Sequence, residues 1–373
     1  MSITIERVCT MADLQSHREA WNALARTTPM AQFFQSYDWF AVYWKHFGAD
    51  QQMEVRLVFE DEQLLGIVPL IIRRESRRIG KLSVLTFPLD DWGSFYAPIS
   101  RDPERTIRAV IDHLAQARKD WDILSWRWLN SQSPLSRSIA EQMAAKHLRT
   151  FPATRCTTAL IDLPRTWEEY LASRTGKFRN NLRRWRKRIE EVGELRYEKF
   201  RPALEPAGAS DPRWDLYDHC ERLAAKSWQG SSQSGTTLSH ESIRPFLREV
   251  HQVAADLGAV DLNLLYLDNQ AVAFEYGYCW QGYKYSLRFG YDHHVSQAGI
   301  GNLMWLDTIQ ASIVSGDHTF DMGPGSLDYK HHYFTRTVDC QTLDHYRQFA
   351  PKAQALALKQ VFQSWWSAPP MVS

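Results

Sequence analysis

The residues with the clearest potential for chemistry lie between residues 261 and 336. Here a glycine-containing turn, residues 292–302, follows an aromatic strand and runs directly into residues 303–314, where leucine and isoleucine recur with helical spacing. At the start of a helix the backbone N–H groups are unpaired and the helix dipole is positive, so such a turn can bind a phosphate group. The residues that would form this anion-binding cradle are Ser296, Gln297, Gly299, Gly301 and Asn302.

An acidic residue, Glu275, stands within the next strand upstream, residues 271–278, which is otherwise apolar and aromatic. Burial raises the pKa of a carboxyl group, and a carboxylate with a raised pKa can accept a proton from an attacking amine. Alternation along the strand also allows Glu275 to face solvent, or to pair with Arg288 across a hairpin. Glu275 is therefore a candidate general base, with an ion pair as the alternative.

Downstream of the helix, the sequence Asp321-Met322-Gly323-Pro324-Gly325 is followed by Tyr329-Lys330. The histidine pairs at 293–294 and 331–332 invite a metal hypothesis. However, neighbouring residues on a strand point in different directions, and no carboxylate has a matching spacing. We expect no metal site.

The order strand, strand, strand, Ser-x-x-Gly-x-Gly turn, helix and strand resembles the core of the GCN5-related N-acetyltransferase (GNAT) superfamily, with Ser296 where the wider signature begins with glutamine or arginine. More narrowly, the Asp-x-Gly-x-Gly and Tyr-Lys pair resembles CelD-like acetyltransferases of cellulose and exopolysaccharide biosynthesis. The resemblance implies an acyl-CoA donor, foremost acetyl-CoA, and an amine acceptor on a sugar or polysaccharide precursor.

The same resemblance implies roles for individual residues. The thioester carbonyl would be held by strand backbone around Arg288 and Phe289. Tyr329 would donate a proton to the leaving thiolate, Lys330 would bind an anionic group, and Asp321 belongs to the best-matched motif.

The segment Arg174–Arg188 is strongly basic, with Phe178, Leu182, Trp185 and Ile189 on one helical face. Such a run either solvates a surface or binds a polyanion such as RNA. A basic helix that ends in Glu191-Val192-Gly193 between two similar halves also resembles the Fem-type aminoacyl transferases, whose substrate is aminoacyl-tRNA. A tRNA-dependent aminoacyltransferase is therefore the main alternative function.

A weak internal repeat aligns the hairpin of residues 54–72 with that of residues 262–278, setting Gln63 against Gln270. We therefore predict an α/β fold (α+β, mixed sheet) of tandem GNAT-like lobes. The first lobe is degenerate, because Asp102 and Glu104 would repel a phosphate at its corresponding helix start. The expected domains are 1–155, a degenerate N-terminal lobe, 156–345, a catalytic lobe with the inserted basic helix, and 346–373, a helical tail.

Length and composition fit this organisation. The chain has 373 residues and a net charge of +1, so no global field recruits a polyanion. Its five cysteines form no Cys-x-x-Cys motif, which fits a reducing compartment, and no apolar run is long enough to cross a membrane. We expect a soluble cytoplasmic enzyme; a non-catalytic, polysaccharide-associated protein that uses its 15 tryptophans for stacking is a further alternative.

Overall fold

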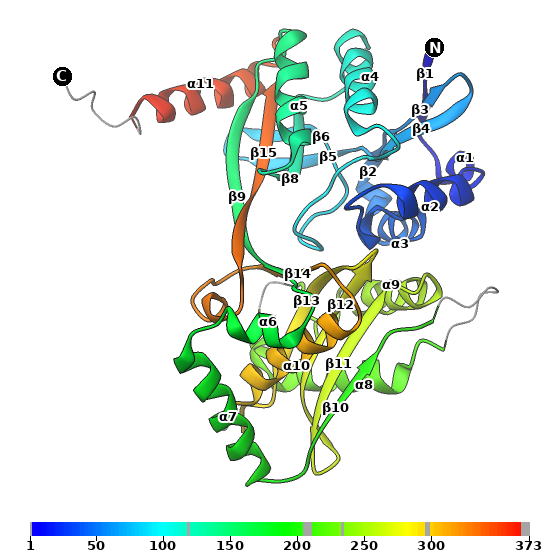
Figure 1. Cartoon of the computed structure of the whole chain (residues 1–373). Helices are drawn as coiled ribbons and strands as arrows, with labels where there is room; N and C mark the ends of the chain where they lie inside the picture. Colours follow the sequence, from blue (N-terminus) through cyan, green and yellow to red (C-terminus); the bar gives the residue numbers. More distant parts are fainter. Residues whose placement is uncertain (1, 118–119, 204–210, 233–234, 295–298, 367–373) are drawn as a thin grey trace.

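The computed structural model describes residues 2–117, 120–203, 211–232, 235–294 and 299–366. The first part of the chain forms one α/β unit, which occupies the upper half of Figure 1. Its elements are β1 (Ile3–Val8), α1 (Met11–Gln15), α2 (Arg18–Thr27), η1 (Phe33–Gln35), α3 (Tyr37–Phe47), η2 (Gly48–Asp50), β2 (Gln51–Met53), β3 (Val55–Glu60), β4 (Gln63–Val68), β5 (Ile71–Arg77), β6 (Gly80–Thr86), β7 (Ile99–Ser100), α4 (Pro103–Gln116), β8 (Ile123–Asn130), α5 (Pro134–Ala145) and β9 (Phe151–Asp162).

The second part forms a similar unit in the lower half of Figure 1, from which its last strand and helix return to the upper half. Its elements are α6 (Trp167–Ala172), α7 (Gly176–Glu190), β10 (Leu195–Phe200), α8 (Trp214–Lys226), η3 (Trp228–Ser231), α9 (Arg244–Asp256), β11 (Val260–Leu267), β12 (Gln270–Trp280), β13 (Tyr283–Tyr291), α10 (Ile300–Val314), β14 (Thr319–Pro324), η5 (Lys330–His332), β15 (Arg336–Tyr346) and α11 (Pro351–Trp366).

The two units repeat one hairpin and one parallel strand pair. The β3–β4 hairpin turns at Asp61-Glu62 and the β11–β12 hairpin at Asp268-Asn269, and all four turn residues have positive φ, as a tight hairpin turn requires. Each unit also contains one parallel strand pair that extends over three residues. The pair is β6 with β8 in the first unit and β13 with β14 in the second. The predicted mixed α/β fold is confirmed, and the weak sequence repeat corresponds to a repeated structure.

One long sheet runs through both units, with the strand order β10-β11-β12-β13-β14-β9-β15-β8-β6-β5-β2, beside a smaller sheet β1-β3-β4-β7. The central strands are exchanged. β9, from the end of the first unit, lies between β14 and β15, whereas β15, from the end of the second, lies between β9 and β8. Each unit is thus completed by a strand from the other.

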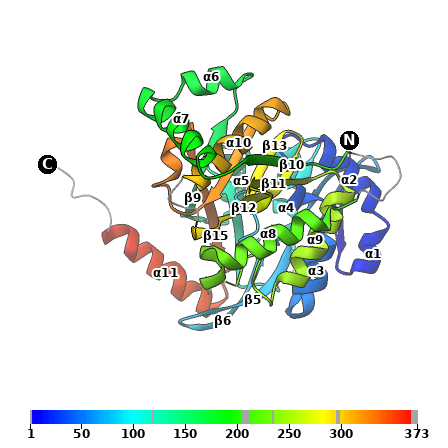
Figure 2. The same cartoon turned by 90° about the horizontal axis from the view of Figure 1, so that it is seen from below.

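Helices cover both faces of the second unit's strands, with α7 and α10 on one face and α8 and α9 on the other (Figure 2). An apolar core under α8 and α9 continues into the first unit, where α3 packs against α9. A separate apolar cluster lies under α7 and α10, with Trp305 and Ile309 of α10 among its members. This second face carries Gly299 and Gly301, the glycines predicted to bind phosphate.

Candidate functional site

A cavity of about 560 Å³ lies where β13 and β14 diverge, beside the start of α10. The parallel pairing of these strands ends at Tyr285 and Asp321, so the strand ends beyond that point separate and leave room between them. The cavity is lined by Trp228, Phe289, Tyr291, Gly299, Gly301, Asn302, Trp305, Pro324, Gly325, Ser326 and Tyr329. Four residues named from the sequence as donor-binding, Phe289, Gly299, Gly301 and Asn302, are brought together here.

The first turn of α10 forms one wall of the cavity, and both of its glycines are required by close packing. Gly299 is the N-cap and has φ of 87°; a Cβ there would lie 2.5 Å from the indole of Trp185 in α7. A Cβ on Gly301 would lie 3.0 Å from the ring of Tyr291 and would fill the cavity. The helix start is therefore open to a ligand, and its dipole favours an anion. Ser296 and Gln297, the other two predicted cradle residues, lie outside the described residues.

Aromatic side chains form the opposite part of the cavity. Phe289 stacks on Trp305 with ring centroids 4.6 Å apart. The Phe289 carbonyl accepts hydrogen bonds from Trp228 Nε1 at 3.1 Å and Gln229 Nε2 at 3.2 Å. Sequence reasoning missed Trp228, Tyr291 and Trp305. Alternation could have found Tyr291, because residues two apart on a strand share a face and Phe289 was already predicted.

Tyr329 reaches the cavity from the loop after β14 and is 48% exposed. Partial burial raises the pKa of its hydroxyl to about 12, so the group carries its proton at neutral pH. Its neighbour Lys330 is buried, does not line the cavity, and donates from Nζ to the carbonyls of Gly323 at 2.7 Å and Pro324 at 3.1 Å. Lys330 thus holds the loop that carries Tyr329, and the structure does not place its ammonium where an anionic ligand would enter.

Asp321 is also a buried support outside the cavity lining. Its carboxylate accepts hydrogen bonds from Thr158 Oγ1 in β9 and Tyr283 OH in β13, and from the Gly323 backbone N–H, each at 2.8 Å. Burial raises its pKa despite these donors. Asp321 therefore joins three neighbouring strands at the point where β13 and β14 begin to diverge.

Glu275 is fully buried and lies 2.9 Å from the ammonium of Lys284, and it accepts a hydrogen bond from Asn263 Nδ2 at 2.8 Å. The predicted cross-hairpin partner was wrong: Glu275 faces Phe289 in the register, and a bulge at Gly277 shifts the pairing beyond Tyr276. Burial raises the pKa of Glu275, as expected, but its carboxylate is not among the groups that line the cavity.

Arg288, the other residue predicted at the donor carbonyl, has its guanidinium bound elsewhere. It donates from Nε to the carbonyl of Thr236 at 2.8 Å and lies near the ring of Trp92. Because Phe289 faces the cavity, the adjacent Arg288 faces the other side of the sheet.

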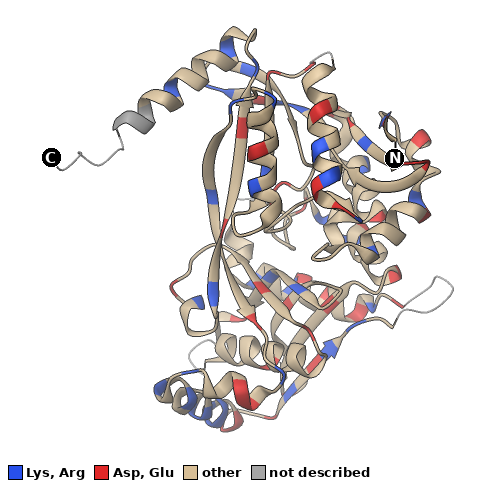
Figure 3. Ribbon diagram, turned by 45° about the horizontal axis from the view of Figure 1, so that its top comes forward, with Lys and Arg blue, Asp and Glu red and all other residues tan. Residues whose placement is uncertain are grey.

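The basic segment forms α7, whose ribbon is largely blue in Figure 3. Arg186 pairs with Asp307 at 2.6 Å, and the guanidinium groups of Arg174 and Arg179 bind backbone carbonyls. Within the described part of the chain, the other five cations are exposed or nearly so and have no hydrogen-bond or ion-pair partner. They are Lys177, Arg183, Arg184, Lys187 and Arg188. Trp185, on the apolar side of the same helix, packs at Gly299, so α7 lies next to the start of α10.

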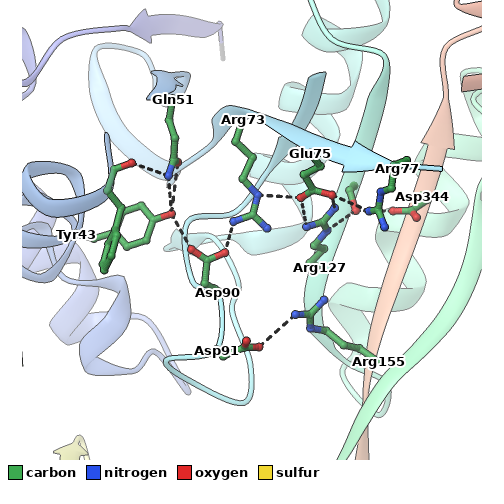
Figure 4. Close-up of polar contacts among 12 residues, drawn as sticks. Tyr43, Gln51, Arg73, Glu75, Arg77, Asp90, Asp91, Arg127, Arg155 and Asp344 are labelled. Atoms are coloured by element: carbon green, nitrogen blue, oxygen red, sulfur yellow. Dashed lines mark hydrogen bonds and ion pairs between the residues drawn. The ribbon is translucent and has the colours of Figure 1, made fainter. Parts of the chain in front are cut away.

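The first unit lacks such a cradle. Asp102 caps α4 with its own side chain, which accepts from the Arg105 N–H at 3.1 Å, and Pro103 follows it. The charged groups of this unit instead pair with one another, as Figure 4 shows for Arg73, Glu75 and Arg127. Although burial favours the neutral acid, these ion pairs lower the pKa of Glu75 to about 2.

Among the described residues, no group of three or more histidine, cysteine, aspartate or glutamate side chains is arranged to hold a metal ion. No helix in the described ranges is long and apolar enough to cross a membrane.

Comparison with known proteins agrees with this geometry. Residues 176–331 match the family model of the acetyltransferase (GNAT) domain. Over 95% of this chain and 99% of the other, the fold is similar to the crystal structure of FemX, with a TM-score of 0.61 and 11% identity. It is also similar to a conserved protein of unknown function from Bacteroides thetaiotaomicron, with a TM-score of 0.57, 15% identity, and coverage of 93% and 100%. No curated protein matches the sequence. The match to the GNAT-domain model thus lies within the second unit and includes the residues that line the cavity.

Lys330 should make stability depend on pH, because burial lowers the pKa of its ammonium from 10.5 to about 8. Below pH 8 the group is charged in both the folded and unfolded states. Between about pH 8 and 10.5 the folded protein releases this proton first, so the free energy of unfolding rises with pH. Relative to Lys330→Met, the wild type should gain up to about 2 kcal/mol between pH 7 and pH 10 in urea denaturation.

The exposed Lys177→Met substitution is the control and should leave this pH dependence as in the wild type. A constant stability difference between the wild type and Lys330→Met across this range would show that the Lys330 ammonium is not destabilised by burial.

Proposed function

We propose that the protein is a GNAT-type N-acyltransferase that moves an acyl group, foremost acetyl, from acyl-CoA to an amine acceptor. The observation that carries the proposal is the cavity between the diverging strands β13 and β14, closed at one end by the glycine-containing start of α10. Its lining residues come from the segment that matches the GNAT domain, residues 176–331.

The described residues fit such a co-substrate. The start of α10, at Gly299 and Gly301, would hold a phosphate of the donor. The aromatic wall of Phe289 and Trp305 would cover its apolar part. The divergence of β13 and β14 leaves strand-edge backbone groups that would hydrogen-bond the thioester carbonyl of the donor.

In the reaction the amine nitrogen attacks the thioester carbonyl carbon, the carbon–sulfur bond breaks, and the amine loses one proton to water. Tyr329 lines the cavity with its proton in place and would donate to the departing thiolate. We do not assign the base to Glu275, because that carboxylate is held by Lys284 away from the cavity.

The acceptor class follows from the CelD-like motif of Asp321 to Lys330, and we propose an amine on a sugar or polysaccharide precursor. The half-exposed indole of Trp228 at the cavity offers an apolar face for such a ring. In this proposal residues 156–345 form the catalytic domain of a cytoplasmic enzyme, residues 1–155 form a degenerate supporting domain, and residues 346–373 form the tail.

Narrowing the cavity at the start of α10 should weaken donor binding. Gly301 lies within the first turn of α10, and a valine there would project toward the rings of Tyr291 and Phe289. We expect Gly301→Val to weaken acetyl-CoA binding by about 10-fold or more in calorimetric titration, since each 1.4 kcal/mol lost is tenfold in affinity.

The matched control is Gly176→Val at the start of α7, where a Cβ has only the Arg179 guanidinium within 4 Å, at 3.9 Å. This variant should bind acetyl-CoA as the wild type does. Undiminished binding by a folded Gly301→Val protein would place the donor elsewhere.

Removing the proposed proton donor should slow turnover without weakening donor binding. We expect Tyr329→Phe to lower kcat by about 100-fold or more, in the range of general acid catalysis, with KM for the donor little changed. Tyr291→Phe removes another hydroxyl group from the same cavity and is the control. Equal kcat values for both variants and the wild type would exclude Tyr329 as the acid.

A second function is favoured by one observation, the five exposed cations on α7 that have no hydrogen-bond or ion-pair partner among the described residues. They would suit a tRNA-dependent aminoacyltransferase of Fem type, in which α7 binds the RNA backbone. We expect Arg183→Glu/Arg184→Glu to weaken filter binding of bulk tRNA about 10-fold and to reduce the salt dependence of binding.

The control for this measurement, Arg78→Glu/Arg137→Glu, makes the same charge change on exposed arginines of the first unit. Equal losses in the two double variants would show that tRNA binds through general charge and not through α7. Acetyl-CoA titration of the same variants separates the two functions.

A further inference from the structure

Two cysteines that are far apart in the sequence lie directly opposite each other in the sheet. Cys156 of β9 is the register partner of Cys340 of β15, in the centre of the exchanged strands. Directly opposed residues of an antiparallel pair have Cα atoms about 4.5–5.5 Å apart, which falls within the roughly 4.4–6.8 Å that a disulfide spans. The two strands therefore already provide the spacing of a cross-strand disulfide.

The two thiols differ in environment. Cys340 is fully buried, whereas Cys156 is only partly buried. A hydrogen bond from Cys340, together with the nearby charge of Arg155, lowers the pKa of the Cys156 thiol against the effect of burial. The hydrogen bond to Cys156 raises the pKa of Cys340. An oxidant from solvent can thus reach one thiol, and the second lies beside it.

The other three cysteines have no such arrangement. Cys9 is exposed after β1, Cys220 is buried in α8, and Cys279 is half-buried in β12. They provide internal controls within the same chain.

We propose that Cys156 and Cys340 form a reversible oxidation site, which a peroxide converts to a disulfide. This goes beyond the proposed acyl transfer and does not depend on it. The Cys156 thiolate attacks one oxygen of hydrogen peroxide, giving a sulfenic acid and, with one proton, water. The Cys340 thiol then attacks the Cys156 sulfur, the sulfur–oxygen bond breaks, and a second water leaves.

The disulfide would join β9 to β15. It would close the long loop of chain that runs from Cys156 to Cys340. Constraining a long loop lowers the entropy of the unfolded state, so oxidation should raise Tm. Cys156 is also two residues from Thr158, whose hydroxyl binds Asp321. The bridge would therefore fasten the strand on which Asp321 depends.

The test uses the full chain, treated with hydrogen peroxide while folded, blocked with an alkylating reagent, and digested without reductant. We expect mass spectrometry to show one bridged peptide pair that contains Cys156 and Cys340. Tm should rise on oxidation and return to its starting value with dithiothreitol. Cys156→Ser and Cys340→Ser should lose the peptide and the Tm shift, whereas Cys279→Ser should keep both.

Two outcomes would overturn the proposal. One is oxidation of Cys156 to sulfinic or sulfonic acid with Cys340 still alkylated in the wild type. The other is formation of the bridged peptide only after denaturation. Neither readout involves donor binding, so a failed acyltransferase assay would leave this result unaffected.

Discussion

The strand exchange between β9 and β15 is the constraint on which the rest of the structure depends. With the order β14-β9-β15-β8, neither unit can complete its sheet from its own sequence. β14, which forms one side of the cavity mouth, pairs on its other edge with β9 from the first unit. The Thr158 hydroxyl of β9 binds Asp321 at the point of divergence. A unit without a cradle of its own thus supports the site of its neighbour.

The two units build the same framework with different helix starts. In η1, Gln35 donates from Nε2 to the Ala97 carbonyl at 2.6 Å and accepts from the Gln32 N–H. In η3, Gln229 donates in the same way to Phe289 and accepts from the Leu238 N–H. The carbonyl that this glutamine binds precedes the next α-helix in both units: Ala97 lies just before β7, and Phe289 lies within β13. The difference lies in the helix that follows: α4 begins with a capping Asp102, whereas α10 begins at Gly299.

Local patterns in the sequence predict much of this fold. The hairpins, the glycine turn that opens α10 and the basic helix each depend on residues close together in the chain, and each lies where it was expected. The exchange of β9 and β15 was not predicted, because strand alternation specifies which face is buried but not which neighbour is paired. The same limit applies to Glu275, since a bulge at Gly277 shifts its register and its cation, Lys284, comes from the next strand.

The motif from Asp321 to Lys330 shows why the roles of buried charges were harder to predict than their positions. Asp321 fastens the strand end, and Gly323 and Gly325, with φ of 73° and 121°, turn the chain sharply after it. Lys330 then binds the carbonyls of Gly323 and Pro324. An ammonium buried in this way needs carbonyl partners, because leaving it unpaired would cost several kcal/mol. Its hydrogen bonds fix the loop on which the adjacent Tyr329 is presented to the cavity. The charged members of the motif are therefore supports, and the tyrosine is the member that lines the cavity.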